Sequence, residues 1–189
     1  MITLVLSSNM KRMVKNNVLV RKLVGIETAG SLNILFTDKT GTLTNGKMEV
    51  IQISSINNSF NSMIELNNYP KYKELIINSI IYNTDSIYDP TTSTIIGGNL
   101  TDKSLMDFVK TKQNKEVQII DKLAFDSKNK YSISIIDKNN NKIKLVKGAV
   151  EKIINECNYY YDLDGKRNLL KNKKELLSKI DNITSKGIR

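Results

Sequence analysis

The sequence predicts an α+β fold in which an antiparallel sheet is flanked by helices. Three β-rich runs follow one another with short connections: Glu116–Phe125, Tyr131–Ile136 and Lys142–Lys147. Segments with apolar residues at helical spacing lie before and after these runs. Ahead of them, a short apolar run ends in a loop rich in threonine and glycine. That loop indicates that the chain begins in one domain and continues into another.

The composition restricts the possible chemistry. The chain has 189 residues, of which 40% are hydrophobic, and this is enough to bury a core. Its net charge of +10 could indicate a nucleic-acid or membrane partner. The lysines are scattered rather than gathered in a stripe, so we expect no nucleic-acid partner. The single cysteine rules out an internal disulfide. The chain has no histidine, which excludes catalysis by histidine and metal binding by histidine.

Residues 1–23 begin with an apolar segment, Met1–Ser8, which is shorter than the about 20 residues that span a bilayer as a helix. The basic segment Asn9–Lys15 follows and is typical of a membrane helix that emerges into the cytoplasm. We therefore expect the end of a membrane helix and a cytoplasmic stalk. The alternative is an amphipathic N-terminal helix of a complete soluble protein.

A candidate nucleophile follows the next apolar run. Leu32–Leu35 has no polar alternation, which predicts a strand that is buried on both faces and ends at Asp38. The residues after Asp38 favour a tight loop whose backbone N–H groups and hydroxyls can face a phosphoryl group. A carboxylate in that position can attack phosphorus. The alternative is that Asp38 only caps a turn.

The remaining elements are predicted in order along residues 47–189. The patterns predict a strand at Met48–Ile53, a loop at 57–68, a helix at about 70–83, a loop at Thr84–Gly98, a helix with Thr101 as its N-cap, the three strands, a hairpin turn at Asp137–Asn141, and helices at Ala149–Cys157 and Asn168–Lys186. Tyr159–Tyr161 is a β-prone run, and the sequence DLDG after it predicts a turn.

The run FTDKTGTLT, from Phe36 to Thr44, resembles the phosphorylation motif of the P-type ATPases, which transfer the γ-phosphate of ATP to an aspartate. The resemblance implies that Asp38 becomes the aspartyl phosphate and that Lys39 belongs to the catalytic motif. It implies that Asp38 and the carbonyl of Thr40 hold Mg²⁺, and that the side chains of Thr40 and Thr42 face phosphate. The sequence Val20–Leu23 and the pair Glu27-Thr28 resemble the end of the fourth membrane helix and the approach to the motif.

Four further stretches resemble the ATP-binding domain of the same family, and they imply six binding residues. Asp102 would lie near the adenine amino group, where relatives usually carry glutamate. Phe125 would stack on adenine, and Lys130 would lie near the nucleotide. Lys147 would approach the ring or the phosphates, Gly148 would let the purine come close, and Arg189 would contact phosphate.

The resemblance implies three parts: the membrane-helix end and stalk (1–23), the N-terminal part of a haloacid-dehalogenase-like α/β phosphorylation domain (24–46), and the nucleotide-binding domain (47–189). We expect a fragment of an ATP-driven cation pump, with ATP and Mg²⁺ as cofactors and calcium as the favoured ion. In the intact protein it would lie at the cytoplasmic face of the membrane and connect to missing membrane helices, whereas the fragment itself would be soluble. The absence of histidine disfavours copper transport, because heavy-metal members carry paired histidines.

Two other functions stay open. A phosphatase of the haloacid dehalogenase superfamily shares the strand-tip aspartate, but usually has a second aspartate at the position of Thr40. An ATP-binding module without catalysis is the other alternative. The later motifs of the phosphorylation domain are absent between Asp38 and Arg189. We therefore expect this chain to bind nucleotide without turnover.

Overall fold

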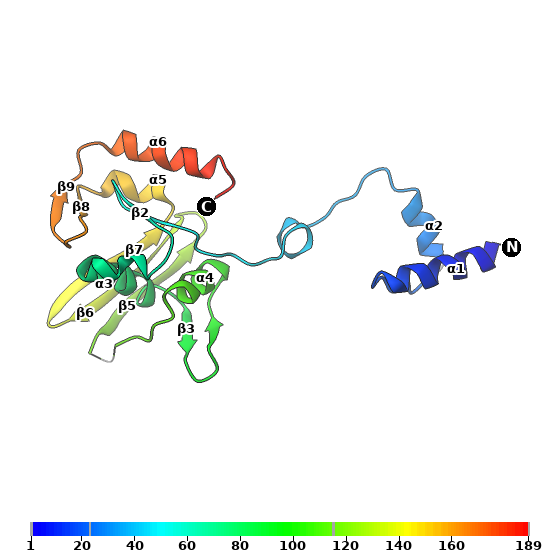
Figure 1. Cartoon of the computed structure of the whole chain (residues 1–189), viewed down its shortest axis with the longest axis horizontal. Coiled ribbons are helices and arrows are strands. Elements are labelled where there is room, and N and C mark those ends of the chain that lie inside the picture. Colours follow the sequence, from blue (N-terminus) through cyan, green and yellow to red (C-terminus); the bar gives the residue numbers. More distant parts are fainter. Residues whose placement is uncertain (1, 23, 115, 189) are drawn as a thin grey trace. The chain divides into compact units, whose positions relative to one another are not determined.

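The computed structural model describes residues 2–22, 24–114 and 116–188, and the chain divides into two compact units, Met1–Gly46 and Lys47–Arg189 (Figure 1). The helices are α1 (Ile2–Lys15), α2 (Val24–Gly30), α3 (Pro70–Ile81), α4 (Leu100–Val109), α5 (Val150–Ile153) and α6 (Lys173–Thr184). The strands are β1 (Ile53–Ser54), β2 (Ser59–Phe60), β3 (Ser86–Asp89), β4 (Thr94–Gly97), β5 (Gln118–Asp126), β6 (Tyr131–Lys138), β7 (Asn141–Gly148), β8 (Tyr159–Tyr161) and β9 (Arg167–Leu169).

The first unit contains α1 and α2. The basic residues Arg12 and Lys15 lie in the last turn of α1, where positive charge is favourable for a helix. Among the described residues, none of the helices combines the length and the apolar composition that are needed to span a membrane.

The prediction of a buried strand before Asp38 is wrong for this structure. Residues 32–38 form no strand, and the side chains of Leu35 and Phe36 are 74% and 93% exposed. The described part of the chain offers these residues no strand to pair with, and a lone strand leaves its backbone donors and acceptors to water. The apolar run is nonetheless extended at its end, because Asp38 has φ −70° and ψ 145°.

The second unit is built around a three-stranded antiparallel sheet in the order β5-β6-β7. This confirms the predicted antiparallel sheet with helices, and each strand lies within a few residues of its predicted bounds. The connection between β6 and β7 is a two-residue turn in which Asn139 and Asn140 both have positive φ, 55° and 61°. Two positive φ values match the right-handed twist of the paired strands, and asparagine tolerates this conformation.

The core lies between one face of this sheet and the helices α3 and α4, which are drawn in green in Figure 1. Its buried members are Ile80, Ile81, Tyr82, Met106, Val109 and Ile136. In β6, alternate side chains are buried, because Ser132, Ser134 and Ile136 face the helices. An ion pair between Lys138 Nζ and Glu74 Oε1 (2.6 Å) joins β6 to α3, and the hydrogen bond from Lys138 lowers the pKa of the Glu74 carboxyl.

Several predicted elements have different bounds. Most of the loop predicted at Thr84–Gly98 is the hairpin β3-β4, residues 86–97. In it Tyr88 and Ile95 pack against the core while Ile87 and Ile96 face solvent. The side chain of Asp89 stabilises its turn by accepting hydrogen bonds from Thr91 N (2.9 Å) and Thr92 Oγ1 (2.9 Å).

The other differences are at the ends of the second unit. The predicted strand at 48–53 is paired only at Ile53–Ser54, because its partner β2 has two residues. The loop predicted at 57–68 contains β2 and a 3₁₀ turn at Glu65–Asn68. The DLDG turn is confirmed, but the strand β9 follows it and pairs with β8, so α6 begins at Lys173 rather than at residue 168. The helix predicted at 149–157 ends as a 3₁₀ turn at Ile154–Glu156.

The residue Ser134 is fully buried, and its hydroxyl finds no hydrogen-bond partner among the residues that the structure describes. Replacing it by alanine removes an unsatisfied polar group. We expect Ser134→Ala to raise the free energy of unfolding by about 1 kcal/mol, measured by urea denaturation. The control is Ser132→Ala, because the Ser132 hydroxyl donates to Asn83 Oδ1 (3.3 Å). A loss of stability in both variants would show that the Ser134 hydroxyl is satisfied in solution.

Candidate functional site

The second unit contains a cavity of about 1140 Å³ between the sheet, the start of α4 and the segment before β3. This volume is large enough for a nucleotide. The lining residues come from six places in the sequence: Met48, Asn83 to Asp85, Asn99 to Asp102, Lys122 to Phe125 with Ser127 and Lys130, Ser132 with Ile133, and Lys147 to Ala149 with Glu151.

Five of the six residues that the sequence assigned to nucleotide binding line this one cavity: Asp102, Phe125, Lys130, Lys147 and Gly148. The sixth, Arg189, lies outside the described residues. The five come from α4, β5, β7 and the turn after β5, so the fold brings together positions up to 46 residues apart in the sequence.

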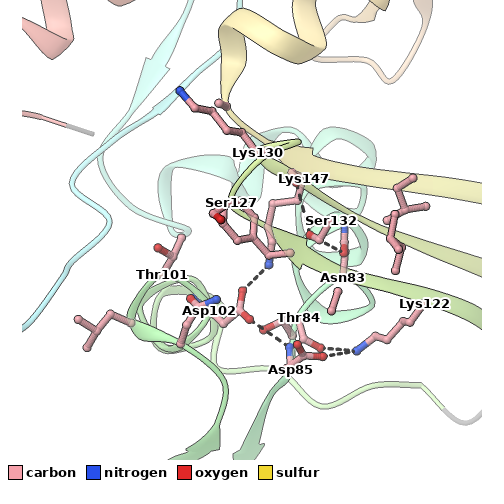
Figure 2. A pocket seen from close by; sticks show the side chains of 18 of the residues that line it. Asn83, Thr84, Asp85, Thr101, Asp102, Lys122, Ser127, Lys130, Ser132 and Lys147 are labelled. Carbon is pink, nitrogen blue, oxygen red and sulfur yellow. Dashed lines mark hydrogen bonds and ion pairs between the residues drawn. The ribbon is translucent and has the colours of Figure 1, made fainter.

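The floor of the cavity is an ion pair between Lys147 Nζ on β7 and Asp102 Oδ1 on α4 (Figure 2). Asp102 is almost completely buried, with 4% of its side chain exposed, and Lys147 is 26% exposed. The second carboxylate oxygen of Asp102 accepts from the backbone N–H of Asp85 at 3.3 Å. The pair therefore joins the helix, the sheet and the segment before β3.

The start of α4 has a different cap from the predicted one. The N-cap is Asn99, whose side-chain oxygen accepts from the backbone N–H of Asp102 at 2.9 Å. Thr101 is the second residue of the helix and donates weakly to the sulfur of Met48. Capping by Asn99 turns Asp102 toward the sheet, and an acid in the first turn also suits the helix dipole.

Lys130 occupies the turn between β5 and β6 with φ +61°. Its backbone is fixed by two hydrogen bonds, from its own N–H to Asp126 O (2.7 Å) and from Ala149 N–H to its carbonyl (2.9 Å). Figure 2 shows its side chain extending away from the Lys147–Asp102 pair. Its Nζ lies 3.7 Å from Glu151 Oε1.

Phe125 and Gly148 contribute shape. Phe125 lines the cavity and is 55% exposed, so its apolar ring is available to a ligand. A Cβ at Gly148 would lie 2.6 Å from Tyr131 Cβ and closer still to the carbonyl of Lys130. The missing side chain of Gly148 thus lets the neighbouring strand approach, which is a different role from admitting a purine.

The sequence did not identify a second polar group in the cavity, Lys122. Its Nζ donates to Thr84 O (2.7 Å) and to Asp85 Oδ1 (3.0 Å). Asn83 and Thr84 are also buried, at 4% and 5% exposure. Lys122 belongs to no motif, and the residue pattern of β5 did not indicate that its side chain lines a cavity. The polar triplet Asn83-Thr84-Asp85 after an apolar helix was the one available signal.

Each lysine that lines the cavity faces a carboxylate: Lys122 with Asp85, Lys130 with Glu151 and Lys147 with Asp102. The three cations and three anions cancel, so the formal charge of the lining is zero despite the +10 of the chain. Electrostatic attraction of a polyphosphate into this cavity is therefore weaker than the net charge suggests.

The residues assigned to phosphorylation form a compact turn in the first unit. Gly41 has φ +82°, and the turn Lys39–Leu43 closes through Thr44, whose N–H and hydroxyl donate to the carbonyl of Lys39 at 3.2 and 3.4 Å. Asp38, Lys39, Thr40 and Thr42 are all exposed. This confirms the tight loop after Asp38, although the strand before it is absent.

Mg²⁺ prefers oxygen ligands in an octahedron and keeps several waters. The Asp38 carboxylate and the Thr40 carbonyl are oxygen donors of the right type. The described residues contain no group of three or more acidic, cysteine or histidine side chains that could hold a metal by themselves. The donor chemistry fits Mg²⁺ only with waters and a phosphate as the further ligands.

Comparisons with known proteins give a consistent result. Residues 71–189 match the family model described as P-type ATPase, cytoplasmic domain N. The chain is 29% identical over 188 residues to calcium-transporting ATPase 1 of Bacillus cereus, covering 95% of the chain and 20% of that protein. It is 30% identical over 213 residues to calcium-transporting ATPase 1 of Saccharomyces cerevisiae, covering 100% of the chain and 22% of that protein.

A third relative, plasma membrane calcium-transporting ATPase 4 of Bos taurus, is 31% identical over 189 residues, covering 91% of the chain and 16% of that protein. The chain therefore spans about a fifth of the length of the curated relatives it matches.

Gly148 tests the packing of the cavity wall. We expect Gly148→Ala to lower the free energy of unfolding by about 1–3 kcal/mol, because the new methyl group would meet the backbone of Lys130 and Tyr131. Urea denaturation measures this change. Gly25→Ala is the matched control, since outside its own helix no described residue lies within 4 Å of the Cβ position at Gly25. Equal stability of Gly148→Ala and the unmodified chain would contradict the close approach of the two strands.

Proposed function

Because this chain belongs to the P-type ATPase family, we propose that its second unit binds ATP in the cavity floored by Lys147 and Asp102. The observation that carries the proposal is the convergence of Asp102, Phe125, Lys130 and Lys147, from separate stretches of sequence, on one cavity of sufficient size. Phe125 supplies a face for base stacking, and the lysines supply cations for phosphate.

The balanced charge of the cavity affects how ATP would be held. A phosphate group has to compete with Glu151 for Lys130 and with Asp85 for Lys122. These two carboxylates are exposed, at 59% and 63%, so their pairs are screened by water and exchange easily. Base stacking and shape then contribute a larger share of the affinity than charge does.

We further propose that Asp38 is the phosphorylated residue of the intact protein. In the reaction, a carboxylate oxygen of Asp38 attacks the γ-phosphorus of ATP, the bond from that phosphorus to the β-γ bridging oxygen breaks, and ADP leaves with the electron pair. Lys39, Thr40 and Thr42 form the exposed turn beside this carboxylate. Mg²⁺ held by Asp38 and the Thr40 carbonyl would neutralise phosphate charge.

The parent protein is proposed to be a cation pump with these domains on the cytoplasmic face of a membrane. Calcium is the favoured ion, and the similarity to calcium-transporting ATPases supports it. Residues 1–23 are proposed as the end of a membrane helix and stalk, residues 24–46 as the start of the phosphorylation domain, and residues 47–189 as the nucleotide-binding domain.

Titration calorimetry with a non-hydrolysable ATP analogue tests nucleotide binding. We expect Phe125→Ala to weaken binding by about five- to 150-fold, because stacking on a base contributes about 1–3 kcal/mol. Phe125 is 55% exposed, so its removal leaves the core intact. The control is Phe36→Ala, which removes a 93% exposed ring that does not line the cavity. Unchanged affinity in Phe125→Ala would contradict the stacking role.

Phosphorylation is tested with the same chain, ATP labelled at the γ-phosphate, and Mg²⁺. We expect binding but no label on Asp38, because this sequence lacks the later motifs of the phosphorylation domain. Label that survives acid in the unmodified chain and disappears in Asp38→Asn would contradict the expectation. Rapid release of phosphate from a generic phosphomonoester, lost in Asp38→Asn, would support the phosphatase alternative.

A further inference from the structure

The turn Lys39–Leu43 is followed by the pair Asn45-Gly46, and no other asparagine of the sequence precedes a glycine. This order of residues permits a reaction within the chain itself. The backbone nitrogen of the second residue can attack the side-chain carbonyl carbon of asparagine and close a five-membered ring. Glycine favours this ring closure, because it has no Cβ to hinder the approach and its backbone adopts conformations that other residues avoid.

The structure leaves both reacting groups accessible. Asn45 is exposed and belongs to no helix or strand. The turn before it is closed by Thr44, whose N–H and hydroxyl donate to the carbonyl of Lys39. Within the part of the chain that the structure describes, the Asn45 side chain and the Gly46 N–H take part in no hydrogen bond. The attacking nitrogen therefore has no such bond to break before it reacts.

A similar pair in the second unit is held in place. Asp164 precedes Gly165, and an aspartate can close the same ring with loss of water. There the Gly165 N–H donates to the carbonyl of Asp162 at 3.0 Å. The Cβ position of Gly165 also lies 3.0 Å from Cβ of Lys71, so the turn is packed against the start of α3. We expect this contact and this hydrogen bond to suppress ring closure at Asp164.

We propose that Asn45 is a modification site at which the chain converts itself, without an enzyme, to isoaspartate and aspartate. The Gly46 nitrogen bonds to Cγ of Asn45 and loses its proton, the bond from Cγ to the side-chain nitrogen breaks, and ammonia leaves. Water then opens the ring. Attack of water at the main-chain carbonyl carbon gives isoaspartate, in which the backbone runs through the former side chain. Attack at Cγ gives aspartate.

The products differ from asparagine in charge and in backbone length. Both carry a carboxylate, so the net charge of the chain falls by one unit from +10. Isoaspartate also inserts a methylene group into the backbone. Gly46 lies close to the turn after Asp38, since its Cβ position is 3.2 Å from Cα of Gly41. The longer backbone therefore changes the geometry next to the turn that carries the proposed phosphorylation, whereas the modification itself does not depend on nucleotide binding.

The experiment incubates the whole chain at physiological temperature and follows it by tryptic peptide mass mapping. Cleavage after lysine gives peptides 40–47 and 23–39, in which Asn45 and Asn33 are the only asparagines. Asn33 is the matched internal control, because it is also exposed and outside any helix or strand, but is followed by the β-branched Ile34, which crowds the attacking nitrogen.

We expect peptide 40–47 to gain, over time, the mass that replacing NH₂ by OH adds, as two products that separate by chromatography. Peptide 23–39 keeps its mass over the same period. Equal rates of change in the two peptides, or an unchanged peptide 40–47, overturn the inference.

Asn45→Gln tests the assignment to this residue, because glutamine needs a six-membered ring, which closes more slowly. A protein isoaspartyl methyltransferase with a labelled methyl donor measures isoaspartate in the whole chain. We expect the aged chain to take up label, Asn45→Gln to lose it and the control Asn33→Gln to keep it. Label that persists in Asn45→Gln would place the reaction at another residue, such as Asp164, and would overturn the proposal.

Discussion

The second unit depends on one buried ion pair, between Lys147 at the end of β7 and Asp102 in the first turn of α4. Removing either partner from such a pair leaves an uncompensated charge in a medium of low polarity, which costs more than the pair itself contributes. The constraint reaches further, because Asp102 also binds the backbone of Asp85 and lies against Gly98. A single carboxylate thus contacts the sheet and the root of a hairpin from the first turn of a helix. The cavity is the space that this arrangement leaves open.

The sequence was most informative where local rules and packing agree. The antiparallel strands were predictable from β-rich runs and an asparagine turn, and α3 from Pro70 and helical spacing. The hairpin β3-β4 was missed because proline and threonine dominate its turn, so the segment was taken as a loop despite the apolar residues Tyr88 and Ile95. The strand predicted before Asp38 does not form, for a different reason. The apolar run has the composition of a strand, but a strand needs a second segment to pair with, and the described residues pair none with it.

The same distinction applies to the site. Short motifs indicated Asp102, Phe125, Lys130, Lys147 and Gly148, which share the cavity. They did not indicate how these residues contact one another. The partners Asp85, Glu151 and Lys122 were not predicted as site residues, and together with Asp102 they bring the formal charge of the cavity lining to zero. Gly148 was noticed for its motif, yet its small size serves the approach of the Lys130–Tyr131 backbone. Pairwise contacts of this kind are invisible to a linear pattern.

Lys130 illustrates a compromise between stability and reach. Its φ of +61° is a conformation that glycine or asparagine adopts more readily than a long side chain does. Two backbone hydrogen bonds keep it there, and its amine extends to the rim beside Glu151. Laboratory evolution under thermal selection alone would drift toward glycine or asparagine at this turn. If lysine persists under selection for growth, the charge of Lys130 contributes more to the function of the protein than its strained backbone costs in stability.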